Sequence, residues 1–291
     1  MESITNNAPL IVILGPTASG KTALAIQLAS QFDGEIIAAD SRTVYKGMDI
    51  ATAKPNAVER SEVRHHLLDV VKPNEVFTVA DFKRLANAAI KDIASRGKIP
   101  FLVGGSGLYI DAVIYNYGLR PVGSSALRDE LNQLSVEELQ ERLRQKSIPL
   151  PRNDRNPRHL IRAIETGGIL SKKEELRPKT LVLGLDPDRE VLQAKITARV
   201  DAMVNDGLVS EVYRLATEYG WNTPAMQTPG YRAFRSYLDG TASIDQAKKL
   251  FVQADLQYSK RQKTWFKRNR DILWISKTTD LVDLVTTFLS K

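Results

Sequence analysis

ILGPTASGKT, residues 13–22, contains a phosphate-binding motif between a predicted strand and a predicted helix. The apolar run LIVIL ends inside it, and the helical pattern TALAIQLASQF begins at its last residue. Gly15 and Gly20 permit the backbone angles that turn consecutive N–H groups toward an anion, and the helix adds the positive end of its dipole. Lys21 offers a positive charge to terminal phosphates, and the Thr22 hydroxyl can bind Mg²⁺. We therefore predict a diphosphate or triphosphate site formed by Gly15, Pro16, Thr17, Ala18, Ser19, Gly20, Lys21 and Thr22, with Thr22 as the magnesium ligand.

The rest of the chain alternates short apolar runs with longer helical patterns. Buried strands are predicted at Leu10–Leu14, Glu35–Asp40, His66–Val71, Ile99–Gly105 and Thr180–Asp186. Strands separated by helices predict an α/β fold, a P-loop NTPase-like parallel sheet flanked by helices. From Gly118 to about Pro178, charged helical patterns replace the strands. We therefore predict a core of residues 1–117 and 179–291, with a helical insertion domain over 118–178.

The composition favours an intracellular protein with an acidic partner. The 291 residues carry a net charge of +7, and 43% of them are hydrophobic. The absence of cysteine excludes disulfides and thiolate metal sites, including a zinc-finger extension. No secretory signal precedes the core, and no apolar run approaches the ~18 residues that span a bilayer. We expect a cytoplasmic protein without a membrane segment, and a positive charge that suits nucleic acid, a phosphorylated metabolite or solubility alone.

Asp40 ends the second predicted strand and opens the segment SRTVYKGMDIATAKP. The carboxyl end of a parallel strand lies in the crevice where such sheets bind ligands, so Asp40 is expected near the phosphate loop. The alternative is a turn or helix-capping aspartate with no contact to ligand.

Seven segments in one order resemble the tRNA dimethylallyltransferases, from about Leu10 to Trp274. They are GPTASGKT, AADSRTVYKGMDIATAKP, HHLLDVV, VADFKRLA, FLVGGSGLYI, RVDAMVNDGLVSEV and QYSKRQKTWFKRN. The resemblance implies that the phosphates belong to dimethylallyl diphosphate and that its allylic C–O bond breaks. The acceptor would be the exocyclic N6 of the adenosine on the 3′ side of the anticodon in tRNA. Lys21 and Thr22 would act catalytically on the leaving diphosphate, and Asp40 would be the general base.

Further site residues follow from the resemblance by position. Arg199 would help bind diphosphate, although an exposed helix arginine is an equal alternative. Residues Asp40, Ser41, Arg42 and Thr43, with Ser106, match the segments that contact the adenine. Thr43 stands where the family commonly has Gln, and Thr228-Pro229 departs from the pattern before Gly230, Tyr231 and Arg232, which are still carried over as an RNA contact. His65 and His66 lack partners for a metal site.

Two basic regions bear on RNA binding, and the first of them lies where the family contacts the anticodon stem-loop. In the predicted insertion they are Arg128 and the segment RHLIR, which comprises Arg158, His159, Leu160, Ile161 and Arg162. In the last long helix, Lys260, Lys263 and Lys267 recur at helical spacing. A solvated face is the alternative for that stripe. With the resemblance, both regions predict RNA backbone contacts.

Three other functions remain open at this point: a small-molecule P-loop kinase, an adenylate isopentenyltransferase acting on free nucleotide, and a non-catalytic RNA-binding module. The arginine-bearing insertion favours the RNA acceptor, and the intact loop with Asp40 favours an enzyme. We expect a monomer that uses Mg²⁺, dimethylallyl diphosphate and tRNA. Whether ATP also binds the loop does not follow from the sequence.

Overall fold

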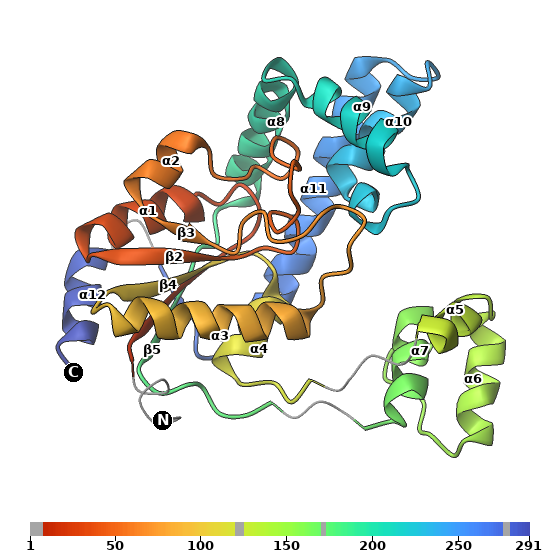
Figure 1. Cartoon of the computed structure of the whole chain (residues 1–291), viewed down its shortest axis with the longest axis horizontal. Coiled ribbons are helices and arrows are strands. Elements are labelled where there is room, and N and C mark those ends of the chain that lie inside the picture. The colour runs from red at the N-terminus through yellow and green to blue at the C-terminus, as the bar shows by residue number, and fades with distance from the viewer. Residues whose placement is uncertain (1–7, 120–124, 170–172, 276–279) are drawn as a thin grey trace. The chain divides into compact units, whose positions relative to one another are not determined.

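The computed structural model describes residues 8–119, 125–169, 173–275 and 280–291. Over these residues the strands form one parallel sheet in the order β3-β2-β4-β1-β5-β6 (Figure 1). The strand bounds are β1 Leu10–Leu14, β2 Gly34–Ala39, β3 His65–His66, β4 Ile99–Gly104, β5 Thr180–Gly184 and β6 Leu273–Trp274. Because β4 lies between β1 and β2, the loops that follow these three strands leave the sheet side by side. This arrangement confirms the predicted α/β class.

The predicted strands are confirmed with one exception. The third is wrong beyond His66, because Leu67 and Asp69 have φ angles of 64° and 55°, in the left-handed region where a strand cannot continue. Farther along, an isolated parallel β-bridge joins Tyr45 and Val71. The short strand β6 has no counterpart in the sequence-based prediction.

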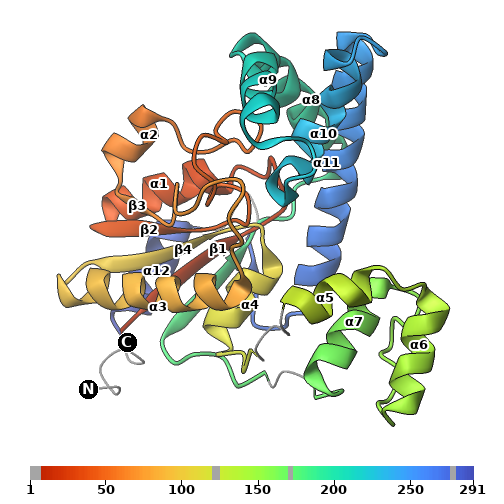
Figure 2. The same cartoon turned by 45° about the vertical axis from the view of Figure 1, so that its right-hand side comes forward.

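Helices cover both faces of the sheet. Helix α1 (Lys21–Gln31) and helix α3 (Val79–Ser95) lie on opposite sides of β2 and β4 (Figures 1 and 2). The α1 face packs alternate residues of the central strands, such as Ile11, Ile13 and Phe101, into one buried cluster. The predicted capping box of α3 is present, because Thr78 and Asp81 bond each other's backbone N–H groups. The other helices of this region are α2 Ala57–Glu62, α4 Gly107–Ile114 and α12 Leu281–Leu289.

The chain after β5 is helical and builds a second buried cluster. It contains α8 Arg189–Asn205, α9 Leu208–Tyr219, the short 3₁₀ turn Pro224–Gln227, α10 Pro229–Leu238 and α11 Ile244–Phe266. Apolar residues of these helices pack with Val44, Tyr45 and Met48 from the loop after β2. The helices thereby support the loop that begins with Asp40.

The chain forms two compact units. One comprises Met1–Ile114 and Leu176–Lys291, and the other comprises Tyr115–Glu175. The second unit is helical where it is described: α5 Ser125–Asn132, α6 Val136–Gln145 and α7 Pro157–Thr166. Its small core includes Leu139, Leu143 and Leu160. The capping box predicted for Ser135 and Glu138 begins α6, and α7 ends at Gly167 with φ 61°. Among the described residues no helix is long and apolar enough to cross a membrane.

A buried carboxylate ties the edge of the sheet to the helix layer. Glu35 in β2 is 4% exposed and accepts hydrogen bonds from both terminal nitrogens of Arg96, one of them at 2.7 Å. His66 Nε2 lies 2.7 Å from the same carboxylate. The Arg96 hydrogen bond is the main cause that lowers the pKa of Glu35 to about 2. Glu35 is therefore ionised in the folded chain at any pH near neutrality.

We expect Glu35→Gln to lower the free energy of unfolding at pH 7 by about 2 kcal/mol, because Arg96 loses its charged acceptor. A group with a lowered folded pKa stabilises above its unfolded pKa of 4.5, and this contribution is lost as pH falls toward about 2. Urea midpoints of wild type and variant should therefore converge on acidification through this range. Asp33→Asn is the matched control, since Asp33 is 77% exposed in its pair with Lys98. Equal midpoints for wild type and Glu35→Gln at pH 7 would contradict the expectation.

Candidate active site

The phosphate loop connects β1 to α1 in the conformation that the motif predicts. Ala18 and Gly20 have φ angles of 59° and 91°, and the Ser19 N–H donates to the Pro16 carbonyl at 3.3 Å. Helix α1 begins directly after Gly20, with no side-chain cap and no acidic residue in its first turn. Its N–H groups are therefore free to meet an anion. They face a cavity of about 430 Å³ that residues 17–22 line.

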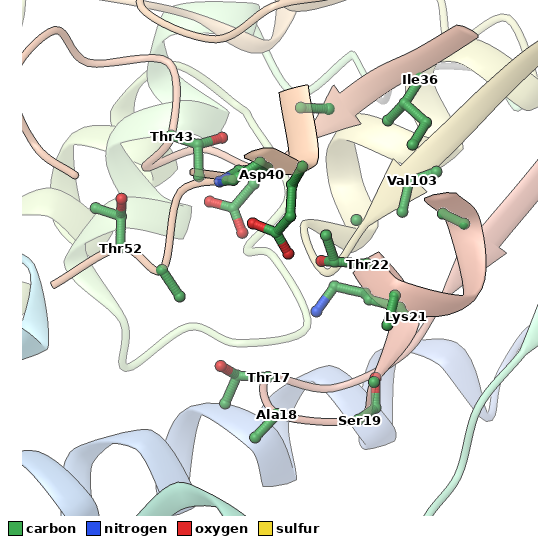
Figure 3. A pocket seen from close by; sticks show the side chains of 18 of the residues that line it. Thr17, Ala18, Ser19, Lys21, Thr22, Ile36, Asp40, Thr43, Thr52 and Val103 are labelled. Carbon is green, nitrogen blue, oxygen red and sulfur yellow. The ribbon is translucent and has the colours of Figure 1, made fainter. Parts of the chain in front are cut away.

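Lys21 and Asp40 line this same cavity (Figure 3). The Lys21 amino group donates to the Pro16 carbonyl at 3.2 Å. Burial lowers the pKa of Lys21 to about 8; Asp40 counteracts this and Arg199 adds to it. Asp40 Oδ1 accepts the Arg42 N–H at 2.7 Å, which fixes the carboxylate at the end of β2. The sequence prediction that Asp40 lies near the phosphate loop is confirmed.

Arg199 reaches the phosphate loop from α8. Its Nη2 donates to Thr17 Oγ1 at 2.8 Å and to Asp255 Oδ2 at 2.5 Å, and its Nε has no partner among the described residues. The arginine lines the cavity and its side chain is 24% exposed. The structure therefore brings Arg199 to the predicted diphosphate site, where its role in binding stays a prediction.

Helix α11 supports the site through two residues that the sequence analysis missed, one bonded to the loop and one bonded to Arg199. Gln262 is 5% exposed; it accepts the Thr17 N–H at 2.9 Å and donates to the Gly105 carbonyl at 2.9 Å. Asp255 binds Arg199. Both lie with Ser259 on a buried polar stripe at helical spacing, between the buried Phe251 and Phe266. Polar residues on the buried face of a helix were the signal that could have found them.

A second cavity adjoins the first. Its volume is about 190 Å³, and it shares Thr17, Asp40 and Arg199 with the phosphate-loop cavity. Its remaining lining includes the aromatic rings of Phe251 and Tyr258, together with Arg42, Arg261 and Gly230. Asp40 thus stands between a space lined by a phosphate loop and a space lined by aromatic and basic side chains.

The predicted adenine-contacting residues fall into two groups. Arg42 lines the second cavity. Ser106 Oγ accepts the Ser41 N–H at 3.0 Å, so these two residues hold the turn that carries Asp40. Thr43 is 5% exposed and lines the first cavity, and its hydroxyl has no partner among the described residues. Direct base contact by Ser41, Thr43 or Ser106 stays a prediction.

The segment around Gly230 corrects one prediction. Tyr231 is 0% exposed and its hydroxyl donates to Glu211 at 2.8 Å, so its side chain is unavailable for the predicted RNA contact. Glu211, on α9, also accepts the backbone N–H groups of residues 49–51 at 2.8 to 3.1 Å, which joins α9, and α10 through Tyr231, to the loop after Asp40. Pro229 begins α10, where a missing N–H has no consequence. A Cβ at Gly230 would lie 2.7 Å from Phe251, so the close approach requires glycine.

The predicted RNA segment of the helical unit is only partly exposed. Leu160 and Ile161 lie in its core, and their side chains are unavailable for the predicted contact. Arg158 and His159 are exposed. Arg128 and Arg162, 40% and 36% exposed, each lie 3.4 Å from the buried carboxylate of Glu165. This carboxylate sets the direction of both guanidinium groups.

The stripe on α11 is likewise divided. Lys263 donates to the Pro187 carbonyl at 2.7 Å and pairs with Asp186 at 2.5 Å, and Lys267 lies 3.7 Å from the same carboxylate. Lys263 is therefore largely a structural residue. Lys260, like Arg232 on α10, is exposed. RNA contact by Lys260, Lys263, Lys267 and Arg232 stays a prediction.

The histidines have internal roles. His66 pairs with Glu35, and His65 Nδ1 donates to the Val63 carbonyl at 2.7 Å. In the part of the chain that the structure describes, no group of three His, Cys, Asp or Glu side chains could hold a metal ion.

Comparison with known proteins agrees with this geometry. A family model described as IPP transferase matches residues 43–269. The tRNA dimethylallyltransferase of Roseiflexus sp. (strain RS-1) is 43% identical, with 91% of this chain and 92% of the relative covered. That of Anoxybacillus flavithermus is 41% identical, covering 94% of this chain and 92% of the relative.

Solved structures agree as well. The tRNA isopentenylpyrophosphate transferase of Bacillus halodurans superposes with a TM-score of 0.74 at 35% identity, over 98% of this chain and 96% of that one. A eukaryotic dimethylallyltransferase acting on tRNA superposes with a TM-score of 0.76 at 27% identity. The match covers 96% of this chain and 76% of that one. With a family model over most of its length and curated relatives above 40% identity, the chain belongs to the IPP transferase family of tRNA dimethylallyltransferases.

Proposed function

We propose that this chain transfers the dimethylallyl group of dimethylallyl diphosphate to N6 of the adenosine on the 3′ side of the anticodon in tRNA, releasing diphosphate. One observation carries the proposal: Asp40 lines both the phosphate-loop cavity and the adjoining cavity with aromatic and basic walls. A donor held by its phosphates and an acceptor base can therefore meet at a carboxylate. The names and coverage of the relatives support the same activity.

The transfer step uses the residues at the junction of the two cavities. The allylic C–O bond breaks and its electron pair leaves with the diphosphate, whose charge the loop N–H groups, Lys21 and Arg199 stabilise. The N6 lone pair forms the new C–N bond. That nitrogen is a weak nucleophile because its lone pair is delocalised into the ring, so removal of its proton by Asp40 assists the attack. A base reaches this pocket only after it leaves the stack of the anticodon loop.

Mg²⁺ fits the chemistry of the site. Magnesium bound to phosphates typically takes one or two protein oxygens and fills its remaining positions with substrate oxygens and waters. Thr22 lines the phosphate-loop cavity at the start of α1 and would hold the ion through its hydroxyl. When bound, Mg²⁺ neutralises charge on the leaving diphosphate. The absence of a three-residue acidic or histidine cluster among the described residues is consistent with an ion held mainly by its substrate.

The exposed arginines of the helical unit, Arg128, Arg158 and Arg162, suit an RNA partner. Guanidinium groups pair with phosphates and stack on unpaired bases, and Glu165 holds two of them in fixed directions. Lys260 and Lys267 add exposed charge to α11. We propose that both regions bind the anticodon stem-loop through its backbone.

Incubation of the purified chain with labelled dimethylallyl diphosphate, Mg²⁺ and unmodified tRNA tests the function. Mass analysis of the digested nucleosides should reveal an adenosine that carries one added prenyl group. AMP as acceptor and ATP labelled on its terminal phosphate as donor provide the comparison. Prenylated AMP without prenylated tRNA would indicate a nucleotide prenyltransferase instead, and phosphoryl transfer without prenylation would indicate a kinase.

A further inference from the structure

Asp255 is a buried carboxylate at the junction of the two cavities. It is 8% exposed and lines the smaller cavity with Asp40. Its Oδ2 lies 2.5 Å from Arg199 Nη2, the same nitrogen that donates to Thr17 Oγ1 at 2.8 Å. One guanidinium nitrogen therefore donates to both the carboxylate and the phosphate loop, and Asp255 holds Arg199 at the loop.

Asp255 also places a negative charge near the site from which the product diphosphate would leave. Burial raises the pKa of Asp255, and the adjacent Arg199 counteracts only part of this shift. The negative charge is inferred from the pairing itself, a carboxylate oxygen 2.5 Å from a guanidinium nitrogen. A diphosphate oxygen bound to Arg199 Nη1 would lie about 7 Å from this charge, which is the width of the guanidinium plus a hydrogen bond of about 3 Å on either side. Even with the dielectric constant of water, Coulomb's law at about 7 Å gives nearly a threefold effect on affinity per unit of ligand charge. For an anion of charge about −3, the total exceeds tenfold.

Two opposing requirements meet at this point. The site holds a concentration of positive charge that stabilises diphosphate as it departs from the prenyl group, and the same charge would retain the product. Product release commonly limits turnover. A carboxylate that fixes Arg199 by hydrogen bonding, while offsetting its charge, preserves the geometry and weakens retention.

We propose that Asp255 is a positioning residue that holds Arg199 at the phosphate loop and offsets its charge, so that the product diphosphate is released. The proposal rests on the function proposed above, in which diphosphate is the leaving group. It extends the site by a residue of α11 that acts on diphosphate through its hydrogen bond to Arg199.

Calorimetric titration with inorganic diphosphate at low ionic strength and without Mg²⁺, so that the ligand keeps its charge of about −3 and screening is small, tests the proposal without requiring transfer. Asp255→Asn keeps an oxygen that can accept from Arg199 and removes the charge, so it should bind diphosphate at least about tenfold more tightly than wild type. Asp255→Glu keeps the charge and should bind it within about threefold of wild type, allowing for a small displacement. In steady state, diphosphate should inhibit Asp255→Asn more strongly, with kcat and the KM for tRNA lowered together and kcat/KM for tRNA unchanged, because only a step after transfer is slowed.

A merely structural role predicts the opposite sign, because a loosened Arg199 binds an anion less well. Unchanged or weaker diphosphate binding by Asp255→Asn would therefore overturn the proposal. If that variant fails to fold, as judged by circular dichroism and melting temperature, Asp255→Gln, which also keeps an accepting oxygen without the charge, carries the same expectation of tighter binding and the same outcome against it. The proposed function is tested separately, by measuring whether the wild-type protein prenylates tRNA.

Discussion

Asp40→Asn should lower kcat for prenyl transfer by about 10²- to 10⁴-fold, the range over which a positioned general base contributes. The substitution removes the proton acceptor and keeps the size of the side chain. The amide oxygen can still accept the Arg42 N–H that now bonds Asp40 Oδ1 at 2.7 Å, so the turn should keep its shape. Affinity for tRNA, measured by filter binding or fluorescence anisotropy, should change little because the residues proposed to bind the RNA backbone lie elsewhere.

A matched control separates loss of a base from loss of a charge. Glu59 lines the same cavity, but its carboxylate bonds the Asn56 N–H at 2.8 Å in the capping box of α2 (Ala57–Glu62). Glu59→Gln removes one negative charge from the cavity wall without removing Asp40. We expect its kcat to stay within about threefold of wild type, as for a charge on the rim of a site. Wild-type turnover in Asp40→Asn would show that Asp40 is not the base.

The elements around Asp40 were predictable from sequence because local rules act there without competition. The phosphate loop needs Gly20 in a left-handed conformation. The apolar strands β1 and β2, rich in branched residues, are buried in the sheet as their composition predicts. The capping boxes at Thr78 and Ser135 begin helices where the sequence predicts. The rule that ligands bind at the carboxyl ends of parallel strands then placed Asp40 beside Lys21.

The errors arose where tertiary contacts decide. The run after His66 is apolar enough for a strand, but Leu67 and Asp69 turn the chain and Asp69 bonds Lys54 at 2.6 Å. Tyr231 precedes an arginine in the matched motif, which suggested an RNA contact. The sequence cannot show that the Tyr231 hydroxyl instead donates a hydrogen bond to Glu211 in the core. Asp255 bonds Arg199 across 56 residues of chain, and Gln262 bonds Gly105 and Thr17 across 157 and 245 residues, so no local pattern reveals their partners.

The second large effect is expected at Lys21. Lys21→Met should lower kcat/KM for the diphosphate donor by about 10²- to 10³-fold, the effect of removing one donor that stabilises transition-state charge. Methionine occupies similar volume, so the loop, which is held by the Gln262 bonds to Thr17 and Gly105, should remain folded. Lys195→Met is the control, because that exposed lysine lines the mouth of the same cavity. Its effect should be about threefold or less and should diminish with added salt.

The pH profile identifies the amine. Burial lowers the pKa of Lys21 to about 8, so the free enzyme loses this positive charge as pH rises past that value. Because kcat/KM reports the free enzyme, it should fall above about pH 8 in wild type. A bound diphosphate favours the charged amine, so the corresponding limb in kcat should lie at higher pH. The limb should vanish from the kcat/KM profile of Lys21→Met and persist in that of Lys195→Met. If it persists in Lys21→Met, another group titrates there, and the charge that meets the leaving diphosphate does not depend on Lys21.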